Sequence, residues 1–123
     1  MSVELTDPED VKIVTLARSA RARVRSDEGA RVRSDEGACV RDTDGRTYAA
    51  ATVDLSSLKL SAVQVAVAMA VSSGAGGLEA VAVLGESTSV SDADLTAVRD
   101  FAGSGVTVLL AAPDGTVLGT ATS

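Results

Sequence analysis

Residues 61–84 read SAVQVAVAMAVSSGAGGLEAVAVL, a helix, a glycine-rich connection and a strand in that order. Ser61 to Ser73 is predicted to be helical, and Gly74 is a natural helix stop. Glu79 to Leu84 is short, apolar and rich in valine, as expected for a buried strand. A helix that leads directly into a buried strand is typical of sheets that carry helices on their faces.

The segments before this unit predict another helix and a hairpin. Asp7 can cap a helix, Pro8 suits its first position, and acidic residues follow at the positive end of the helix dipole. Apolar residues then recur at three- and four-residue spacing, which predicts a helix from Pro8 to about Arg25. The turn Asp42–Gly45 separates two short segments and predicts a β-hairpin whose second strand ends near Val53.

The segments after the unit complete the pattern. They predict a helix at Ser91–Ala102, a strand at Val106–Ala111, a Pro-Asp-Gly turn, and a last strand at Thr116–Thr122. The predicted order is α-β-β-α-β-α-β-β, which makes an α/β sheet with helices on its faces. With 123 residues, the chain is predicted to form a single domain over 1–123.

An eight-residue tandem duplication interrupts the first helix-to-strand connection. Residues 22–29, ARVRSDEG, are followed by an identical copy at residues 30–37. This period is far shorter than the repeats of solenoid proteins, which run about 20 residues or more. We expect the first copy to finish the helix and the second to form a loop or a distorted extension.

The composition excludes several kinds of chemistry. There is no histidine, which removes Ser-His-Asp and Cys-His catalysis and histidine-bound zinc. Cys39 is the single cysteine and is predicted to be a small buried side chain. The net charge of −6 disfavours nucleic acid and anionic membranes as partners. The start of the chain is acidic and polar, unlike a signal peptide, so we expect a cytoplasmic protein.

Four local segments, in their order and spacing, resemble the small cytidine deaminases. They are a hairpin turn at Asp44–Tyr48, a helix end at Ala70–Gly74, a strand at Ala80–Val83 and a helix end at Val98–Phe101. The resemblance covers nearly the whole chain. It implies a cytidine deaminase-like three-layer α-β-α fold, with a mixed five-stranded sheet and helices on both faces.

The motifs that carry the family's chemistry are replaced. In the family, a Cys-Ala-Glu motif begins the second helix and a Pro-Cys-x-x-Cys motif begins the third; the cysteines bind zinc and the Glu moves protons. By local alignment the ligand positions fall on Ser61, Ser91 and Asp94, and the Glu position falls on Val63. These vestigial pocket positions lack thiolates, so we expect no metal, no cofactor and no catalytic residue at the site.

Capping explains the same residues. Ser61 is followed three positions later by Gln64, the capping-box pattern, and Ser91 with Asp94 is closely related to it. We therefore predict helix N-caps at Asp7, Ser61 and Ser91. Anion binding at the paired helix ends stays open as an alternative.

These observations predict a non-catalytic cytidine deaminase-like protein, or pseudoenzyme, that acts as a structural or binding subunit. The alternative is a small-ligand protein that binds a nucleoside or an anion in the vestigial pocket, and a third is an enzyme of unrelated chemistry. The helix at Ser61–Ser73 is apolar on all sides and must be covered on all sides. We therefore expect a homo-oligomer, and the resemblance implies a tetramer.

Overall fold

The computed structural model describes residues 4–24 and 35–123. Its elements follow the predicted order, with one additional hairpin between the second strand and the second helix. The helices are α1 (Pro8–Arg21), α2 (Ala62–Ser72) and α3 (Asp92–Ala102); the strands are β1 (Gly37–Asp42), β2 (Thr47–Ala51), β3 (Val53–Leu55), β4 (Leu58–Leu60), β5 (Leu78–Leu84), β6 (Thr107–Ala111) and β7 (Val117–Thr122).

Five of these strands form one mixed sheet in the order β2-β1-β5-β6-β7. Strands β5 and β6 are parallel, and the other neighbouring pairs are antiparallel. The parallel pair is joined through α3, as a crossover between parallel strands requires. The β1–β2 and β6–β7 hairpins turn at Gly45 and Gly115, whose φ angles of 85° and 93° favour glycine. The predicted mixed five-stranded sheet is confirmed.

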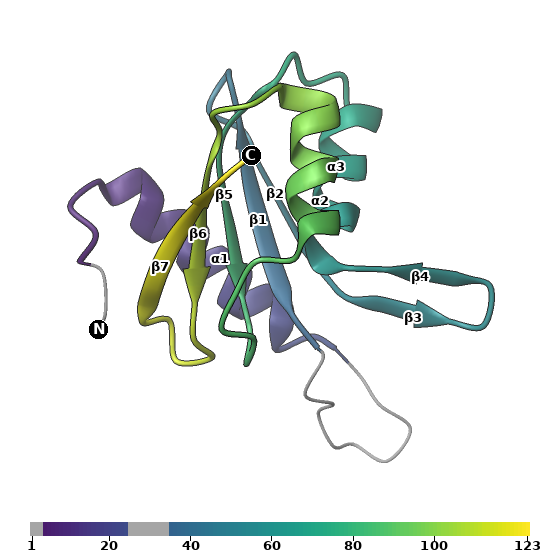
Figure 1. Ribbon diagram of the computed structural model, residues 1–123, viewed down its shortest axis with the longest axis horizontal. Coiled ribbons are helices and arrows are strands. Elements are labelled where there is room, and N and C mark those ends of the chain that lie inside the picture. Colours follow the sequence, from purple (N-terminus) through teal and green to yellow (C-terminus); the bar gives the residue numbers. More distant parts are fainter. Residues whose placement is uncertain (1–3, 25–34) are drawn as a thin grey trace.

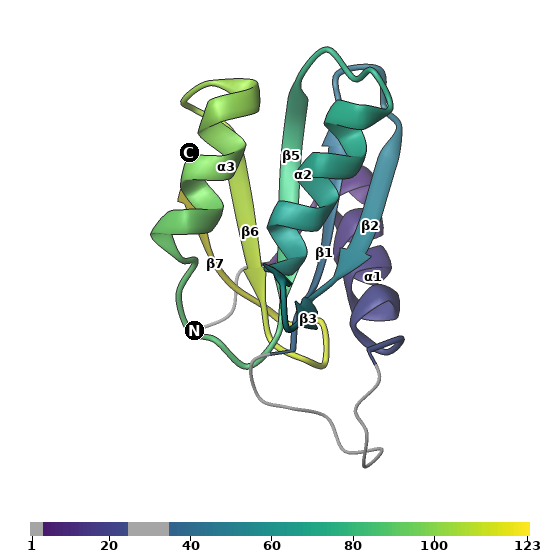
Figure 2. The same ribbon diagram turned by 90° about the vertical axis from the view of Figure 1, so that its right-hand side faces the viewer.

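Helices cover both faces of the sheet. Figures 1 and 2 show α1 on one face and α2 with α3 on the other, which is the predicted α-β-α layering. The alternation of a strand explains this division. In β1, Val40 belongs to the core cluster under α2 and α3, whereas its neighbour Cys39 belongs to the cluster under α1.

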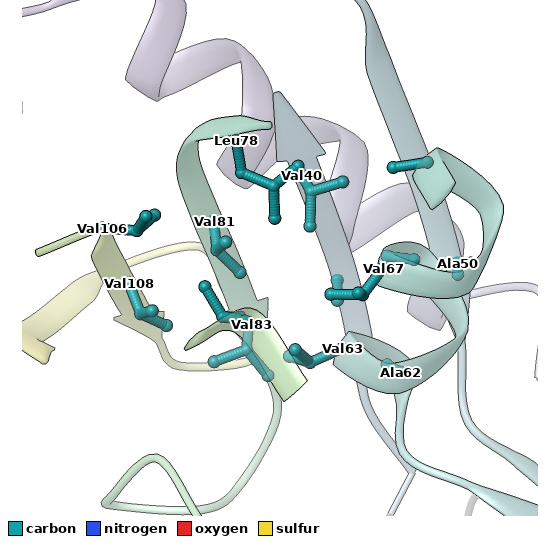
Figure 3. Packing of buried hydrophobic residues seen from close by; sticks show 14 of the residues in the cluster. Val40, Ala50, Ala62, Val63, Val67, Leu78, Val81, Val83, Val106 and Val108 are labelled. Carbon is teal, nitrogen blue, oxygen red and sulfur yellow. The ribbon is translucent and has the colours of Figure 1, made fainter. Parts of the chain in front are cut away.

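Small side chains fill both cores. In Figure 3, Val63 and Val67 of α2 face the valines of the central strands, including Val81 and Val83. Val63 and Val81 have no exposed surface and Val83 has 1%. Side chains of this size allow the helix to lie close to the sheet, and close packing compensates for the small area that each of them buries.

The structure differs from the sequence prediction in two places. Helix α1 ends at Arg21, four residues before the predicted end, so the first copy of the duplication does not finish the helix. The Arg21 side chain turns inward instead, where its Nε donates to the carbonyl oxygen of Asp35 at 3.0 Å. The second copy lies mainly outside the described residues; its last residue, Gly37, begins β1.

The second difference is the β3–β4 hairpin, which the sequence did not predict: β2 ends at Ala51, and Val53, the predicted end of that strand, begins β3. It projects from the end of β2 as an arm (Figure 1). Its register pairs Asp54 with Lys59, and their side chains form an ion pair of 2.6 Å. Leu55 and Leu58 on this arm are 60% and 47% exposed, so the arm lacks a core of its own. Three-residue strands with little burial give a weak periodic signal, which is why pattern reading missed them.

Candidate functional site

The N-termini of α2 and α3 lie next to each other at one end of the sheet, since the two helices pack together on the same face. Ser61 is the N-cap of α2: its Oγ accepts from the Gln64 N–H at 3.1 Å, and Gln64 Oε1 accepts from the Ser61 N–H at 2.9 Å. Ser91 is the N-cap of α3 and accepts from the Asp94 N–H at 3.2 Å. Asp7 caps α1, on the other face of the sheet, by accepting from the Glu9 N–H at 2.9 Å.

A side-chain hydrogen bond joins the two helix ends. The Ser61 hydroxyl donates to Asp94 Oδ1 at 2.5 Å. Asp94 is 4% exposed, and burial raises the pKa of its carboxyl group, while the hydrogen bonds with Ser61 and Ser91 lower it. Three of the four vestigial pocket positions therefore meet around one buried carboxyl group. This group occupies the junction between the two helices.

Val63, the fourth position, lies in the apolar core. It has no exposed surface and packs near Val83 (Figure 3), in the cluster that also includes Val98. A carboxylate at this position would be buried among alkyl groups, which disfavours its charged form. The valine instead contributes its side chain to the packing of α2 on the sheet.

A further acidic residue, Glu36, reaches the same region from the start of β1. Its backbone is held by Thr52: the Glu36 N–H donates to Thr52 Oγ1 at 2.9 Å, and the Thr52 N–H donates to the Glu36 carbonyl at 3.2 Å. Burial and, to a smaller extent, the nearby charge of Asp94 raise the pKa of Glu36 to about 7, against a lowering by Arg21. Glu36 therefore changes between its protonated and ionised forms near neutral pH.

Sequence reasoning missed Glu36. Glu28 holds the same place in the identical first copy, so nothing local distinguishes the two residues. What separates them is that Glu36 directly precedes a central strand of the sheet. Its burial and its place near Asp94 come from the tertiary structure, so no local sequence signal could have found it.

Beside Ser61 lies an open pocket of about 390 Å³, here called the acidic pocket. Its polar side chains come from the start of β1, the residue after β2, the β3–β4 arm and the cap of α2. They are Glu36, Thr52, Asp54, Lys59 and Ser61, and they stand beside the apolar Val53 and Leu60. Lys59 is paired with Asp54, so Glu36 is the group whose protonation sets the pocket's charge.

Cys39 takes no part in this site. It has no exposed surface and lies in the cluster on the α1 face of the sheet. Burial raises the pKa of its thiol to about 11, which disfavours the thiolate. The prediction of a small buried cysteine is confirmed. Among the described residues, no group of three or more His, Cys, Asp or Glu side chains is arranged to hold a metal ion.

A comparison with protein-family models identifies the family of this chain. The family model described as cytidine deaminase-like matches residues 6–115. The chain belongs to the cytidine deaminase-like family. A comparison with curated proteins finds no significant match.

Solved cytidine deaminase structures share the fold of this family member. The enzyme from Burkholderia pseudomallei superimposes with a TM-score of 0.73 at 19% identity, over 91% of this chain and 89% of that one. The enzyme from Mycobacterium leprae gives 0.72 at 21%, over 94% of each chain. The enzyme from Mycobacterium tuberculosis gives 0.70 at 23%, over 83% of this chain and 85% of that one.

The zinc ion of the cytidine deaminases does not fit the residues present here. Ser61 and Ser91 offer neutral hydroxyl groups, which are poor substitutes for thiolates. Both hydroxyls are already engaged as helix caps, and the Ser61 hydroxyl also donates to Asp94. A metal would have to break the hydrogen bonds that hold the two helix ends.

Among residues 4–24 and 35–123, no helix has the length and apolarity needed to cross a membrane.

Proposed function

We propose that this protein is a non-catalytic member of the cytidine deaminase-like family that acts as a structural or binding subunit. The observation that carries the proposal is the Ser61–Asp94 hydrogen bond, which joins the helix ends where the family holds its metal. The bond links α2 to α3, as a shared metal ion would. The site thus still connects the two helix ends, but without the metal ion that would activate a water molecule as the nucleophile.

The chemistry of deamination supports the same proposal. The family's reaction needs a metal-activated hydroxide and a carboxylate that moves protons. Val63 brings no proton-transfer group to the predicted position of that carboxylate. Glu36 titrates near neutrality but lies just before β1 beside Thr52, at the wall of the acidic pocket. A general base alone, without an activated water, supplies a small part of such a rate enhancement, about 10²–10⁴-fold.

Metal analysis and a deamination assay test this proposal. The purified protein should contain far less than one zinc per chain after dialysis and should not convert cytidine or deoxycytidine. The matched control is the triple variant Ser61→Cys, Ser91→Cys, Asp94→Cys, which restores three thiolates at the helix ends and should retain zinc. One zinc per chain in the unmodified protein, or turnover of cytidine, would contradict the proposal.

A second candidate function is the binding of a small uncharged ligand in the acidic pocket. Glu36 and Asp54 line this pocket, and the Asp94 carboxyl group lies at the helix ends where an anion would have to bind. This arrangement favours a nucleoside over a nucleotide or another anion. The comparison to make is cytidine and uridine against their monophosphates in a thermal unfolding series.

At 100 times its dissociation constant, a ligand stabilises the folded protein by about 2.7 kcal/mol, which is easily measured. Stabilisation by nucleosides and not by their monophosphates would favour this function. A larger effect from the monophosphates would show that the charge of the acidic pocket has been misjudged.

We also propose that the protein is a homo-oligomer, with a tetramer favoured. The outer face of α2 carries Met69 and Val71, which are 37% and 49% exposed, and the β3–β4 arm adds exposed Leu55 and Leu58. An apolar groove of about 500 Å³ lies between them, with Val65 and Met69 in its wall. These surfaces are of the kind that subunit contacts cover.

Light scattering at micromolar concentration measures the assembly. A mass near four times 12.3 kDa is expected, and a mass of 12.3 kDa would refute the proposal. The variant Met69→Lys should dissociate the assembly. Leu118→Lys is the matched control, since Leu118 is 38% exposed but lies on β7, at the opposite edge of the sheet.

A further inference from the structure

A second pocket, of about 720 Å³, lies on the α1 face of the sheet, away from the site described above. One wall is α1, and the other is the β6–β7 turn with the first residue of β7. Helix α1 packs over β1, β5 and β2, and it lies behind the sheet in Figure 1. The turn Asp114–Thr116 stands beside the helix and leaves a hollow, here called the α1 groove. Its volume falls within the range of small-molecule sites, about 300–1,000 Å³.

The floor of the α1 groove is apolar. Val14 of α1 and Val117 of β7 line it and are 5% and 4% exposed. Val11, one turn earlier on the same helix face, is 46% exposed at the rim, and Leu5 lines the groove before the helix begins. A ligand with a hydrocarbon part would remove this exposed apolar surface from water.

Among the described residues that line the groove, Arg18 is the single cation. Arg18 follows Val11 and Val14 at helical spacing, so its side chain shares their face of α1. A Cβ added to Gly115 would lie 3.9 Å from Arg18 Cδ, so the stem of the arginine extends over the β6–β7 turn. Within the described part of the chain, Arg18 forms no ion pair. Its guanidinium group is therefore available as a hydrogen-bond donor.

The neighbouring acid, Asp114, is held by the turn. Its Oδ1 accepts from the Thr116 N–H at 2.9 Å, and hydrogen bonds with Thr116, followed by the charge of Arg18, lower the pKa of this carboxyl group. Glu4 lines the groove as a second carboxylate. Among the described lining residues the two carboxylates outnumber the one cation, so the groove disfavours polyanions such as nucleotide phosphates, and a bound monoanion has to place its charge at the Arg18 guanidinium.

We propose that the α1 groove binds a small amphipathic monocarboxylate. Its hydrocarbon part lies along Val11, Val14 and Val117, and its carboxylate accepts two hydrogen bonds from the Arg18 guanidinium. The site is on the opposite face of the sheet from Ser61 and Asp94, so it does not depend on the function proposed for that pocket. It would give this family member a binding activity of its own.

Titration of the full chain with sodium octanoate, followed by amide NMR, tests the proposal. Shifts are expected at Val11, Val14 and Arg18 and in the β6–β7 turn, with the amides of Ser61 and Asp94 unaffected. Octylamine has the same hydrocarbon chain with a positive head and should not bind. Three outcomes would each overturn the proposal. They are octanoate-induced shifts centred elsewhere, equal binding of octylamine, and no binding at about 10 millimolar octanoate, a concentration that would detect even a very weak site.

Two arginine variants separate the charge from general effects. Arg18→Leu removes the guanidinium while keeping an apolar stem. It should weaken octanoate binding at least tenfold, which is about the effect of losing one charge-assisted hydrogen bond. Arg99→Leu removes an exposed arginine from α3 on the other face and should change binding less than about twofold. Equal loss in both variants would show that octanoate responds to net charge and would refute a site at Arg18.

Discussion

Replacing Gly37 by alanine should strongly destabilise this protein. Gly37 is the first residue of β1, where the strand passes beneath the end of α1. A Cβ at this position would lie 1.9 Å from the carbonyl oxygen of Ala17 and 2.7 Å from the backbone nitrogen of Arg21. Both atoms belong to the helix backbone, so no side-chain rotation can relieve the contact. The last turns of α1 would have to move by roughly 1.5 Å to restore an ordinary van der Waals separation.

The loss of stability comes from the core contacts that a movement of α1 would disturb. Ala17 and Ala20 have no exposed surface, so lifting the helix opens the core between α1 and the sheet. Overpacking in a core costs about 1–3 kcal/mol, and a clash with backbone belongs at the upper end, so we expect a loss of about 3 kcal/mol. For a domain of this size the melting temperature should fall by roughly 12–20 °C.

Urea unfolding followed by circular dichroism measures this loss directly, as a lower midpoint at an unchanged slope. The matched control is Gly119→Ala in β7, where an added Cβ meets no atom within 4 Å. That substitution should be neutral or stabilise by about 0.5 kcal/mol, because alanine loses less entropy than glycine in a strand. If Gly37→Ala unfolds within about 0.5 kcal/mol of the original protein, the close approach of α1 to β1 is wrong.

Three other predictions follow from the site and the duplication. Ser61→Ala should cost about 2–3 kcal/mol in urea unfolding, because α2 loses its cap and Asp94 its hydroxyl donor, whereas Ser72→Ala at the exposed end of α2 should stay within about 0.5 kcal/mol. The folded-state pKa of Glu36, about 7, exceeds its ordinary value of 4.5, so its contribution is fully present below 4.5 and is lost as pH rises through 7. Unfolding free energy should therefore fall from pH 5.5 to pH 8, and Glu36→Gln should flatten this slope; an equal slope in the variant would contradict the assignment. Deleting residues 30–37 should leave stability similar or higher, because the identical first copy then supplies the Asp-Glu-Gly that leads into β1, and loss of cooperative unfolding would show that the second copy is structural.

Local pattern predicted most of the fold. Apolar periodicity and turn residues predicted α2, β5, α3, β6 and β7 to within one residue at each end. These elements are long enough for their apolar spacing to stand out, and their ends carry Ser caps or glycines. The same pattern did not predict the β3–β4 arm, because its strands are three residues long and bury little surface. The predicted end of α1 was wrong because the apolar pattern continues beyond Arg21, whereas the helix ends there and the Arg21 side chain turns to the carbonyl oxygen of Asp35.

The sequence by itself determined which chemical groups this protein can use. A chain without histidine and with one cysteine cannot assemble a zinc site of the deaminase kind, whatever its fold. Only the tertiary structure decided what stands in that place. Ser61 and Asp94 are 33 residues apart and meet because α2 and α3 pack side by side on the sheet, where burial raises the carboxyl pKa. Glu36 acquires its pKa of about 7, and Arg18 its place beside an apolar groove, for the same reason: burial and neighbouring charge depend on contacts between segments that local sequence does not encode.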